Sequence, residues 1–209
     1  MSKIKLCGLS RETDISYANF IMPEFVGFVF AVSSKRYVTP EKALRLRKLL
    51  RAGITPVGVF VDEAPETIAE YVKSGIIDVV QLHGSEDDDF IRRLRELTNA
   101  PVIKAFRIKS AEDVLCAESS SADIVLLDSG CGTGKTFDHS LIESVSRPYF
   151  LAGGLTPENV GAAVESLRPY AVDASSSLES EGVKDYSKMK AFADAVRRKS
   201  YGEMSIGKK

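Results

Sequence analysis

The chain lacks a long apolar stretch. Nowhere do about 18 apolar residues follow one another, and charged residues begin at Lys3, so the sequence predicts no transmembrane helix and no export signal. Neither sign of charge is in excess, because 28 lysine and arginine residues stand against 29 aspartate and glutamate residues. This balance argues against a nucleic-acid or anionic-membrane partner. We therefore expect a cytoplasmic protein that captures any anionic ligand at a local site.

Cysteine and histidine are also scarce. The three cysteines, Cys7, Cys116 and Cys131, are odd in number and far apart, which favours reduced thiols over a disulfide framework. The sequence contains neither a Cys-x-x-Cys nor a His-x-His pair. It therefore predicts no metal site.

What the chain does contain is a regular series of short apolar runs, with a mean spacing of about 24 residues. They begin near Ile4, Phe25, Pro56, Val79, Val102, Ile124, Tyr149 and Ala171. One strand, one helix and two short loops fill such a step. Parallel strands must cross over through helices, and eight such units favour a closed α/β fold, the eight-stranded (βα) TIM barrel. We expect one barrel domain over residues 1–200 and a frayed tail over residues 201–209.

Helix-start signals lie between the apolar runs. Thr39-Pro40 and Thr156-Pro157 each place a capping hydroxyl before a proline, which predicts that a helix begins at that proline. Ser85 and Ser110 are each followed three residues later by an aspartate, a spacing typical of a capping box.

Four of the predicted strands end at a side chain that could do chemistry, and the carboxyl ends of all strands in such a barrel meet at one face. Cys7 ends the first strand, although a buried cysteine is commonly just a small apolar residue. Arg36 follows the second and could hold a carboxylate, although adjacent cations usually mark a solvated loop. His83 follows the fourth strand, as a substrate-binding residue or an ordinary core or surface residue. Asp128 ends the sixth, where a charge must be paired, solvated or functional.

The last two strands end in small residues. Gly153 and Gly154 follow the seventh strand, and Ser175 and Ser176 follow the eighth. Exposed backbone N–H groups in such loops can converge on a phosphate, and these are the usual phosphate-binding positions of the fold. Ordinary turns are the alternative, but both loops lie where a phosphate site is expected.

The glycine-rich segment 130–136 resembles a nucleotide-binding P-loop. That motif needs a glycine five residues before Gly134, and position 129 is a serine. A P-loop also belongs early in an open sheet, whereas this segment follows the sixth of eight strands. The glycines fit better a loop that folds over the pocket.

Six motifs in order resemble the phosphoribosylanthranilate isomerase family, from about Lys3 to Val196. They are Lys5-Leu6-Cys7-Gly8-Leu9, Gly27-Phe28-Val29-Phe30 with Lys35-Arg36-Tyr37, Gln81-Leu82-His83-Gly84, Leu127-Asp128 with the loop 132–138, Leu151-Ala152-Gly153-Gly154-Leu155, and Asp173-x-Ser175-Ser176. The resemblance implies a barrel that works without a cofactor in tryptophan biosynthesis. It also implies an Amadori rearrangement of N-(5-phosphoribosyl)anthranilate to the carboxyphenylamino-deoxyribulose phosphate.

The resemblance also implies a role for each matching residue. Asp128 would be the general acid that opens the ribose ring, and Cys7 the general base that takes the C2 proton. Arg36 would hold the anthranilate carboxylate, and the exits of the last two strands would hold the phosphate. Some thiolate character at Cys7 would be needed, which Lys5 or the local dipoles would favour. We also expect Cys7 to react faster with alkylating agents than Cys116, which we place packed in a helix.

Two departures from the family pattern stand out. Ser177 replaces the usual glycine after the eighth strand, which would strain the phosphate loop if that position needs a positive φ angle. The second strand's exit, Ala31-Val32-Ser33-Ser34, lacks the frequent Tyr-Pro-Lys. The rival interpretations are another phosphosugar isomerase or epimerase barrel and a non-catalytic phospholigand-binding barrel. We expect a monomer, since the sequence has no obvious exposed apolar stripe.

Overall fold

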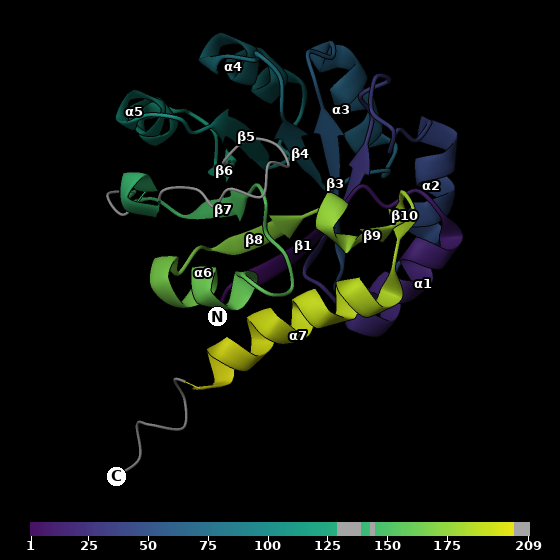
Figure 1. Ribbon diagram of the computed structural model, residues 1–209. Coiled ribbons are helices and arrows are strands. Elements are labelled where there is room, and N and C mark those ends of the chain that lie inside the picture. The colour runs from purple at the N-terminus through teal and green to yellow at the C-terminus, as the bar shows by residue number, and fades with distance from the viewer. Residues whose placement is uncertain (129–138, 143–144, 203–209) are drawn as a thin grey trace.

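The computed structural model describes residues 1–128, 139–142 and 145–202 (Figure 1). Eight parallel strands close into a barrel in sequence order, so the predicted fold class is confirmed. The strands are β1 (Lys3–Cys7), β2 (Phe25–Val29), β3 (Thr55–Phe60), β4 (Val79–Leu82), β5 (Val102–Arg107), β6 (Ile124–Asp128), β7 (Tyr149–Ala152) and β8 (Ala171–Ala174). β8 pairs with β1 and closes the ring.

Helices surround the barrel and cover the outer faces of the strands (Figure 1). They are α1 (Glu12–Ile21), α2 (Pro40–Leu49), α3 (Pro65–Lys73), α4 (Asp88–Leu97), α5 (Ala111–Ser119), α6 (Val160–Leu167) and α7 (Tyr186–Gly202), with short 3-10 helices η1 (His139–Ile142) and η2 (Ser176–Leu178). A two-stranded antiparallel ribbon, β9 (Glu179–Ser180) and β10 (Val183–Lys184), lies between β8 and α7. In the described part of the chain, no helix combines the length and apolar character that a membrane span requires.

The helix-start predictions were right in two cases out of four. Thr39 caps α2, which begins at Pro40, and the capping box at Ser110 begins α5. The cap of α4 is Asp87, so the box predicted at Ser85 was wrong. α6 begins only at Val160, because Thr156 and Asn159 close a turn through the hydrogen bond from the Thr156 N–H to Asn159 Oδ1, at 2.8 Å. Local capping signals are therefore shared by helices and tight turns.

Two predictions concern segments at the edge of what is described. α7 continues to Gly202, past the start of the tail predicted at Tyr201, and residues 203–209 lie outside the described residues. The loop predicted to fold over the pocket, residues 129–138, also lies outside them.

Successive side chains of each strand point alternately out toward the helices and into the barrel. The outward side chains form the main apolar core with the helices, as Ile4, Leu6 and Val26 do. Inside, an apolar cluster that includes Val57 and Phe150 fills the barrel. A smaller cluster of Cys7, Val29 and Val59 lies near the carboxyl ends of β1, β2 and β3. Apolar side chains thus pack beneath much of the face at which the strands end.

Candidate active site

Cys7 lies at the carboxyl end of β1, packed against Val29 and Val59, with 8% of its surface exposed. The neighbouring strand makes room for its sulfur, because Gly27 is the residue of β2 in register with Cys7. A Cβ atom at Gly27 would lie 2.6 Å from Cys7 Sγ and 3.1 Å from Cys7 Cα. Gly27 therefore fixes where the thiol can sit.

We predict that Gly27→Ala displaces the Cys7 thiol and lowers kcat by about 10²-fold, the scale expected when a reacting group moves by roughly 1 Å. Gly58→Ala in β3 is the matched control, because its Cβ would meet Ile77 Cδ1 at 2.6 Å in the apolar core and not the thiol. Steady-state kinetics and thermal denaturation of both variants check this. Equal kcat losses in the two variants would show that Gly27 matters only for packing.

Below Cys7, the barrel interior holds a buried ion pair. Lys5 Nζ lies 3.0 and 3.1 Å from the two carboxylate oxygens of Asp173, and the two residues face each other in the register of β1 and β8. Burial alone would lower the pKa of Lys5, but Asp173 and Cys7 outweigh it and raise that pKa above its ordinary value. Lys5 is therefore a cation within electrostatic reach of the thiol.

The thiol itself is protonated at neutral pH, contrary to our expectation. Burial raises the pKa of Cys7 above its ordinary value of 9.0, and this effect outweighs the lowering influence of Lys5 and Lys184. We expected Cys7 to be alkylated before Cys116 because we placed Cys116 in a packed position. That position was wrong, because Cys116 on α5 is exposed. Apolar neighbours around the sulfur explain the difference, since they disfavour the charged thiolate.

We now predict that iodoacetamide modifies Cys116 before Cys7 at neutral pH. A raised pKa means that the thiolate of Cys7 appears only at higher pH, so its alkylation rate should still increase above pH 9.0. Mass mapping after brief alkylation at several pH values measures this for each cysteine separately. Faster labelling of Cys7 than of Cys116 at pH 7 would contradict the buried, neutral thiol.

Asp128 ends β6, and its carboxylate faces His83 at the end of β4. Asp128 Oδ2 lies 3.6 Å from His83 Nε2, and the two side chains are 24% and 37% exposed. Gln81 fixes the other side of the ring, because its Nε2 lies 3.0 Å from His83 Nδ1. With the Gln81 amide donating, Nδ1 accepts and the proton of a neutral His83 sits on Nε2, toward Asp128.

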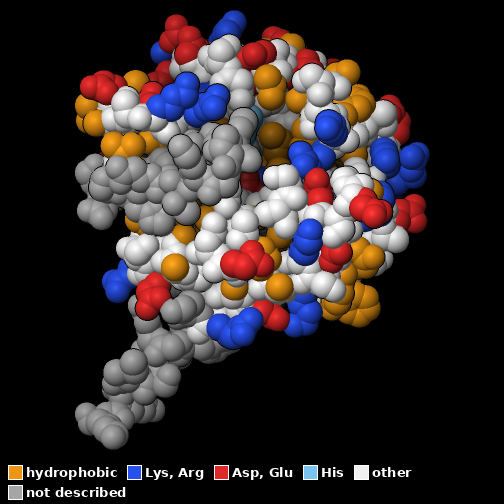
Figure 2. All heavy atoms as spheres, in the orientation of Figure 1, with side chains coloured by type: hydrophobic (Ala, Val, Ile, Leu, Met, Phe, Trp, Pro, Cys, Tyr) orange, Lys and Arg blue, Asp and Glu red, His pale blue; other side chains and the backbone are white. Residues whose placement is uncertain are grey.

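A second buried ion pair holds the loop that carries His83. Lys104 Nζ donates to the carbonyl oxygen of Gly84 at 2.7 Å and to Glu86 at 2.9 Å. Glu86 in turn accepts from the backbone N–H groups of Asp62 and Gly84, at 2.8 and 2.9 Å. The loop that carries the imidazole is therefore held by buried polar contacts of Lys104 and Glu86. Figure 2 shows a surface hollow with basic and apolar side chains at its margin.

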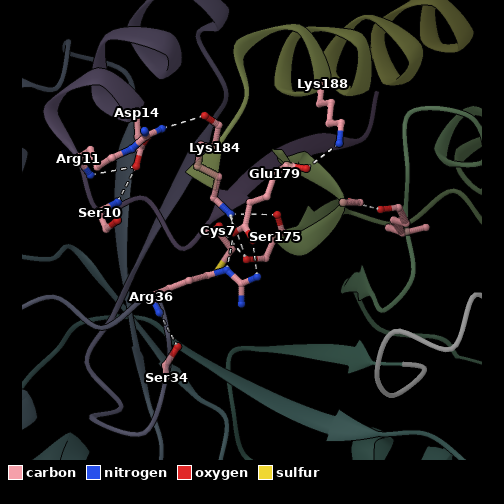
Figure 3. Close-up of polar contacts among 12 residues, drawn as sticks. Cys7, Ser10, Arg11, Asp14, Ser34, Arg36, Ser175, Glu179, Lys184 and Lys188 are labelled. Atoms are coloured by element: carbon pink, nitrogen blue, oxygen red, sulfur yellow. Dashed lines mark hydrogen bonds and ion pairs between the residues drawn. The ribbon is translucent and has the colours of Figure 1, made fainter. Parts of the chain in front are cut away.

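Arg36 reaches the same face from the loop after β2. Its Nε and Nη2 donate to the two carboxylate oxygens of Glu179, at 2.6 and 2.8 Å. Lys184 Nζ donates to the same carboxylate at 2.6 Å. Figure 3 shows Arg36 and Lys184 converging on Glu179 beside Cys7 and Ser175. Burial alone would raise the pKa of Glu179, but the hydrogen bonds from Arg36 and Lys184 hold it below its ordinary value.

The exits of β7 and β8 lie next to each other, as their strands do. Gly153 and Gly154 have φ angles of 89° and 62°, in the region that glycine adopts most readily. Ser177 does not have a positive φ angle, so the strain we considered there is absent. Its hydroxyl instead donates to the carbonyl oxygen of Leu155 at 2.5 Å and links the two exits.

These exits offer backbone donors rather than side chains. Among the described residues, we find no acceptor for the N–H groups of Gly153, Gly154 and Ser176. The hydroxyl of Ser175 is used internally, because it donates to the carbonyl oxygen of Cys7 at 3.0 Å. Ser175 therefore ties the β8 exit to Cys7, and an anion here would meet N–H groups.

The structure brings all the predicted site residues to one end of the barrel. It adds Glu179, Lys184 and Gln81, whose contacts the sequence did not reveal. Glu179 closely follows the eighth strand's exit, but its partners could not be read from spacing. Within the described ranges, no group of three or more His, Cys, Asp or Glu side chains is placed to hold a metal ion.

Comparison with known proteins gives one consistent result. A family model described as N-(5'phosphoribosyl)anthranilate (PRA) isomerase matches residues 4–195. The N-(5'-phosphoribosyl)anthranilate isomerase of Endomicrobium trichonymphae is 44% identical over 194 residues, which cover 90% of this chain and 95% of that relative.

Two solved structures have the same fold. One is a phosphoribosyl anthranilate isomerase in complex with reduced 1-(o-carboxyphenylamino)-1-deoxyribulose 5-phosphate, with a TM-score of 0.85 and 37% identity, covering 95% of this chain and 100% of that chain. The other is a monomeric form of the dimeric isomerase from Thermotoga maritima, with a TM-score of 0.85, 36% identity and the same coverage.

Proposed function

Because this chain belongs to the N-(5'-phosphoribosyl)anthranilate isomerase family of tryptophan biosynthesis, we propose that Cys7 and Asp128 are its general base and general acid. The isomerase activity follows from the family. The assignment of residues rests on one observation: Cys7 and Asp128 end β1 and β6 at the same face, with Arg36 and the small-residue exits of β7 and β8 around them. Acid and base can therefore approach one sugar from different sides.

The first step opens the ribose ring. Asp128 in its acid form gives a proton to the ring oxygen, the C1–O bond breaks, and the anthranilate nitrogen forms a cationic Schiff base with C1. His83 faces Asp128 at 3.6 Å and is placed to exchange a proton with it. We propose that His83 acts next to the substrate in this way, with its ring held by Gln81.

The second step removes the C2 proton. The Cys7 thiolate takes it, and the bonding electrons neutralise the nitrogen to give an enolamine, which tautomerises to the ketone. At rest the thiol is neutral, because burial raises its pKa, so it must first give up its proton to solvent before it can accept the one from C2. A cationic Schiff base above it favours the thiolate, as Lys5 and Lys184 already do.

Binding at two ends orients the sugar between acid and base. We propose that Arg36 holds the anthranilate carboxylate and that the N–H groups of Gly153, Gly154 and Ser176 hold the phosphate. Ser175 belongs to this site through its backbone and through its hydrogen bond to Cys7. The related structure whose bound ligand carries both a carboxylate and a phosphate supports this arrangement.

We predict that the dephosphorylated substrate loses kcat as well as affinity. Remote binding energy can orient the reacting sugar, so its loss affects the transition state and not only capture. The test is steady-state kinetics with N-ribosylanthranilate beside the natural substrate, following the loss of anthranilate-type fluorescence. An unchanged kcat at saturation would mean that the proposed phosphate loops only anchor the substrate, or that they lie elsewhere.

We also propose that the enzyme works as a cytoplasmic monomer, with a phosphorylated small molecule as its ligand and no nucleic-acid partner. Balanced charge supports the last point. The Thermotoga maritima relative is described as dimeric, so light scattering after size-exclusion chromatography is the measurement that distinguishes the two states.

A further inference from the structure

The ion pair between Arg36 and Glu179 uses one particular edge of the guanidinium group. Nε and Nη2 face Glu179, at 2.6 and 2.8 Å. A guanidinium carries five N–H donors, and this side-on pairing employs one on Nε and one on Nη2. The other edge, made of Nη1 and the second Nη2 proton, is the one that can receive another carboxylate in a bidentate manner.

Glu179 is held just as firmly from its other side. Lys184 Nζ lies 2.6 Å from Glu179 Oε1, and the Lys184 side chain is only 1% exposed. The same ammonium donates to the carbonyl oxygen of Ser175 at 2.9 Å and lies 3.3 Å from its hydroxyl. Its three donors are therefore all engaged within the protein, so Lys184 acts on Glu179 and does not itself bind substrate.

The ribbon of β9 and β10 brings Glu179 and Lys184 together. Lys184 of β10 lies directly across from Glu179 of β9 in the antiparallel register. The two turn residues, Glu181 and Gly182, have φ angles of 52° and 80°, as tight hairpins require. Direct cross-strand pairing of opposite charges holds the carboxylate in a fixed orientation.

The stem of Arg36 is fixed as well. Its side chain passes over Gly8, where a Cβ atom would lie 2.3 Å from Arg36 Cδ. Gly8 also has a φ angle of 78°. Because Gly8 follows Cys7 directly, the guanidinium is held beside the thiol, as Figure 3 shows. One carboxylate between two cations leaves a net positive charge at this place.

We infer that Glu179 and Lys184 are positioning residues that aim the free edge of Arg36 at the substrate's carboxylate, and that they thereby set the preference for a carboxylated arylamine. The inference rests on the proposed role of Arg36. It goes further in two respects. It explains why a substrate-binding cation is already paired, and it assigns a role to the ribbon of β9 and β10.

The test compares two substrates in the wild type and in Glu179→Gln. The substrates are N-(5-phosphoribosyl)anthranilate and N-(5-phosphoribosyl)aniline, which differ only in the carboxylate. The quantity measured is the ratio of their kcat/KM values. We expect Glu179→Gln to reduce this ratio about 10- to 100-fold, mainly through kcat with the carboxylated substrate, because a misaimed Arg36 misplaces the reacting carbon. Lys184→Met should reduce it in the same direction.

Two further variants distinguish an effect on the orientation of Arg36 from a general structural effect of the substitution. Lys188→Ala is the matched control, because Lys188 Nζ donates to the backbone oxygen of Glu179, at 2.6 Å, rather than to its carboxylate, and its loss should leave the ratio unchanged. Arg36→Lys removes the planar edge. In that background Glu179→Gln should cause no further loss of the ratio, since it acts through Arg36.

The outcomes are distinguishable. A wild-type enzyme that does not prefer the carboxylated substrate would remove Arg36 from the proposed function. A wild-type preference that survives or increases in Glu179→Gln would overturn the inference while leaving Arg36 in place. Equal losses with both substrates would also overturn it, because they would show a structural role only. Thermal denaturation of each variant confirms that the measured protein is folded.

Discussion

Asp128→Asn is expected to lower kcat by roughly 10²–10⁴, the usual scale of general acid catalysis. The amide keeps the shape of the side chain but has no acidic proton to give to the ring oxygen. Affinity for the reduced product analogue should fall far less, and the fold should persist, because the Asp128 side chain is 24% exposed at a strand end and is not part of the core. Kinetics and analogue titration on the same protein sample check both statements.

The double variant Asp128→Asn with Cys7→Ser removes both the proposed acid and the proposed base. Ring opening and proton abstraction are successive parts of one path, so removing both groups should be little worse than removing either one. A near wild-type kcat in Asp128→Asn would exclude Asp128 as the acid. His83, 3.6 Å away, would then be the next candidate.

Lys5→Met is expected to destabilise the fold by about 3–5 kcal/mol, because it leaves a buried carboxylate without its partner. The Lys5 side chain is 0% exposed and that of Asp173 is 8% exposed. Lys190→Met is the matched control. Lys190 pairs with Asp194 at 2.5 Å on the surface, with side chains 52% and 39% exposed, and a surface pair of this kind contributes about 0–1 kcal/mol. Urea denaturation of the three proteins measures the difference.

The loss of folding stability in Lys5→Met should depend on pH in a direction that the pKa of Asp173 sets. Burial raises the pKa of Asp173, and Lys5 is the main group that opposes this. In Lys5→Met the folded protein therefore favours protonated Asp173, so the destabilisation should be largest at neutral pH and shrink as pH falls through the raised pKa. Adding Asp173→Leu should restore much of the stability at pH 7. A Lys5→Met protein as stable as Lys190→Met would show that the buried pair is not needed.

The barrel was predictable because its signal is local and repeated. Several strands, buried on both faces, are apolar at consecutive positions, as Ile124–Leu127 shows, and the even spacing leaves room for one helix per step. Helix starts were predictable where the cap acts alone, as at Thr39. They failed where a nearby residue competes, as Asp87 does with Ser85.

The site was predictable as a set of strand ends but not as a network. The Lys5–Asp173 pair joins residues 168 apart in sequence, and it exists only because β8 closes on β1. Arg36 and Glu179 are separated by 143 residues. Their pairing depends on the ribbon of β9 and β10, which no periodic pattern in the sequence predicted.

The protonation state of Cys7 was mispredicted for a different reason. The sequence shows that Lys5 lies two residues away, which suggests a stabilised thiolate. It does not show that Cys7 is buried, with 8% of its surface exposed, in a cluster with Val29 and Val59. A nearby cation lowers the pKa of a thiol and desolvation raises it, so the direction of the shift can be predicted only once the burial of the thiol is known.

In the proposed mechanism, one thiol at the end of β1 takes the C2 proton of N-(5-phosphoribosyl)anthranilate. The most direct measurement is single-turnover loss of substrate fluorescence with excess enzyme, comparing folded wild type with folded Cys7→Ser. We expect conversion by the wild type and a rate lower by roughly 10²–10⁴ in the variant. A variant that converts the substrate at the wild-type rate would contradict this mechanism.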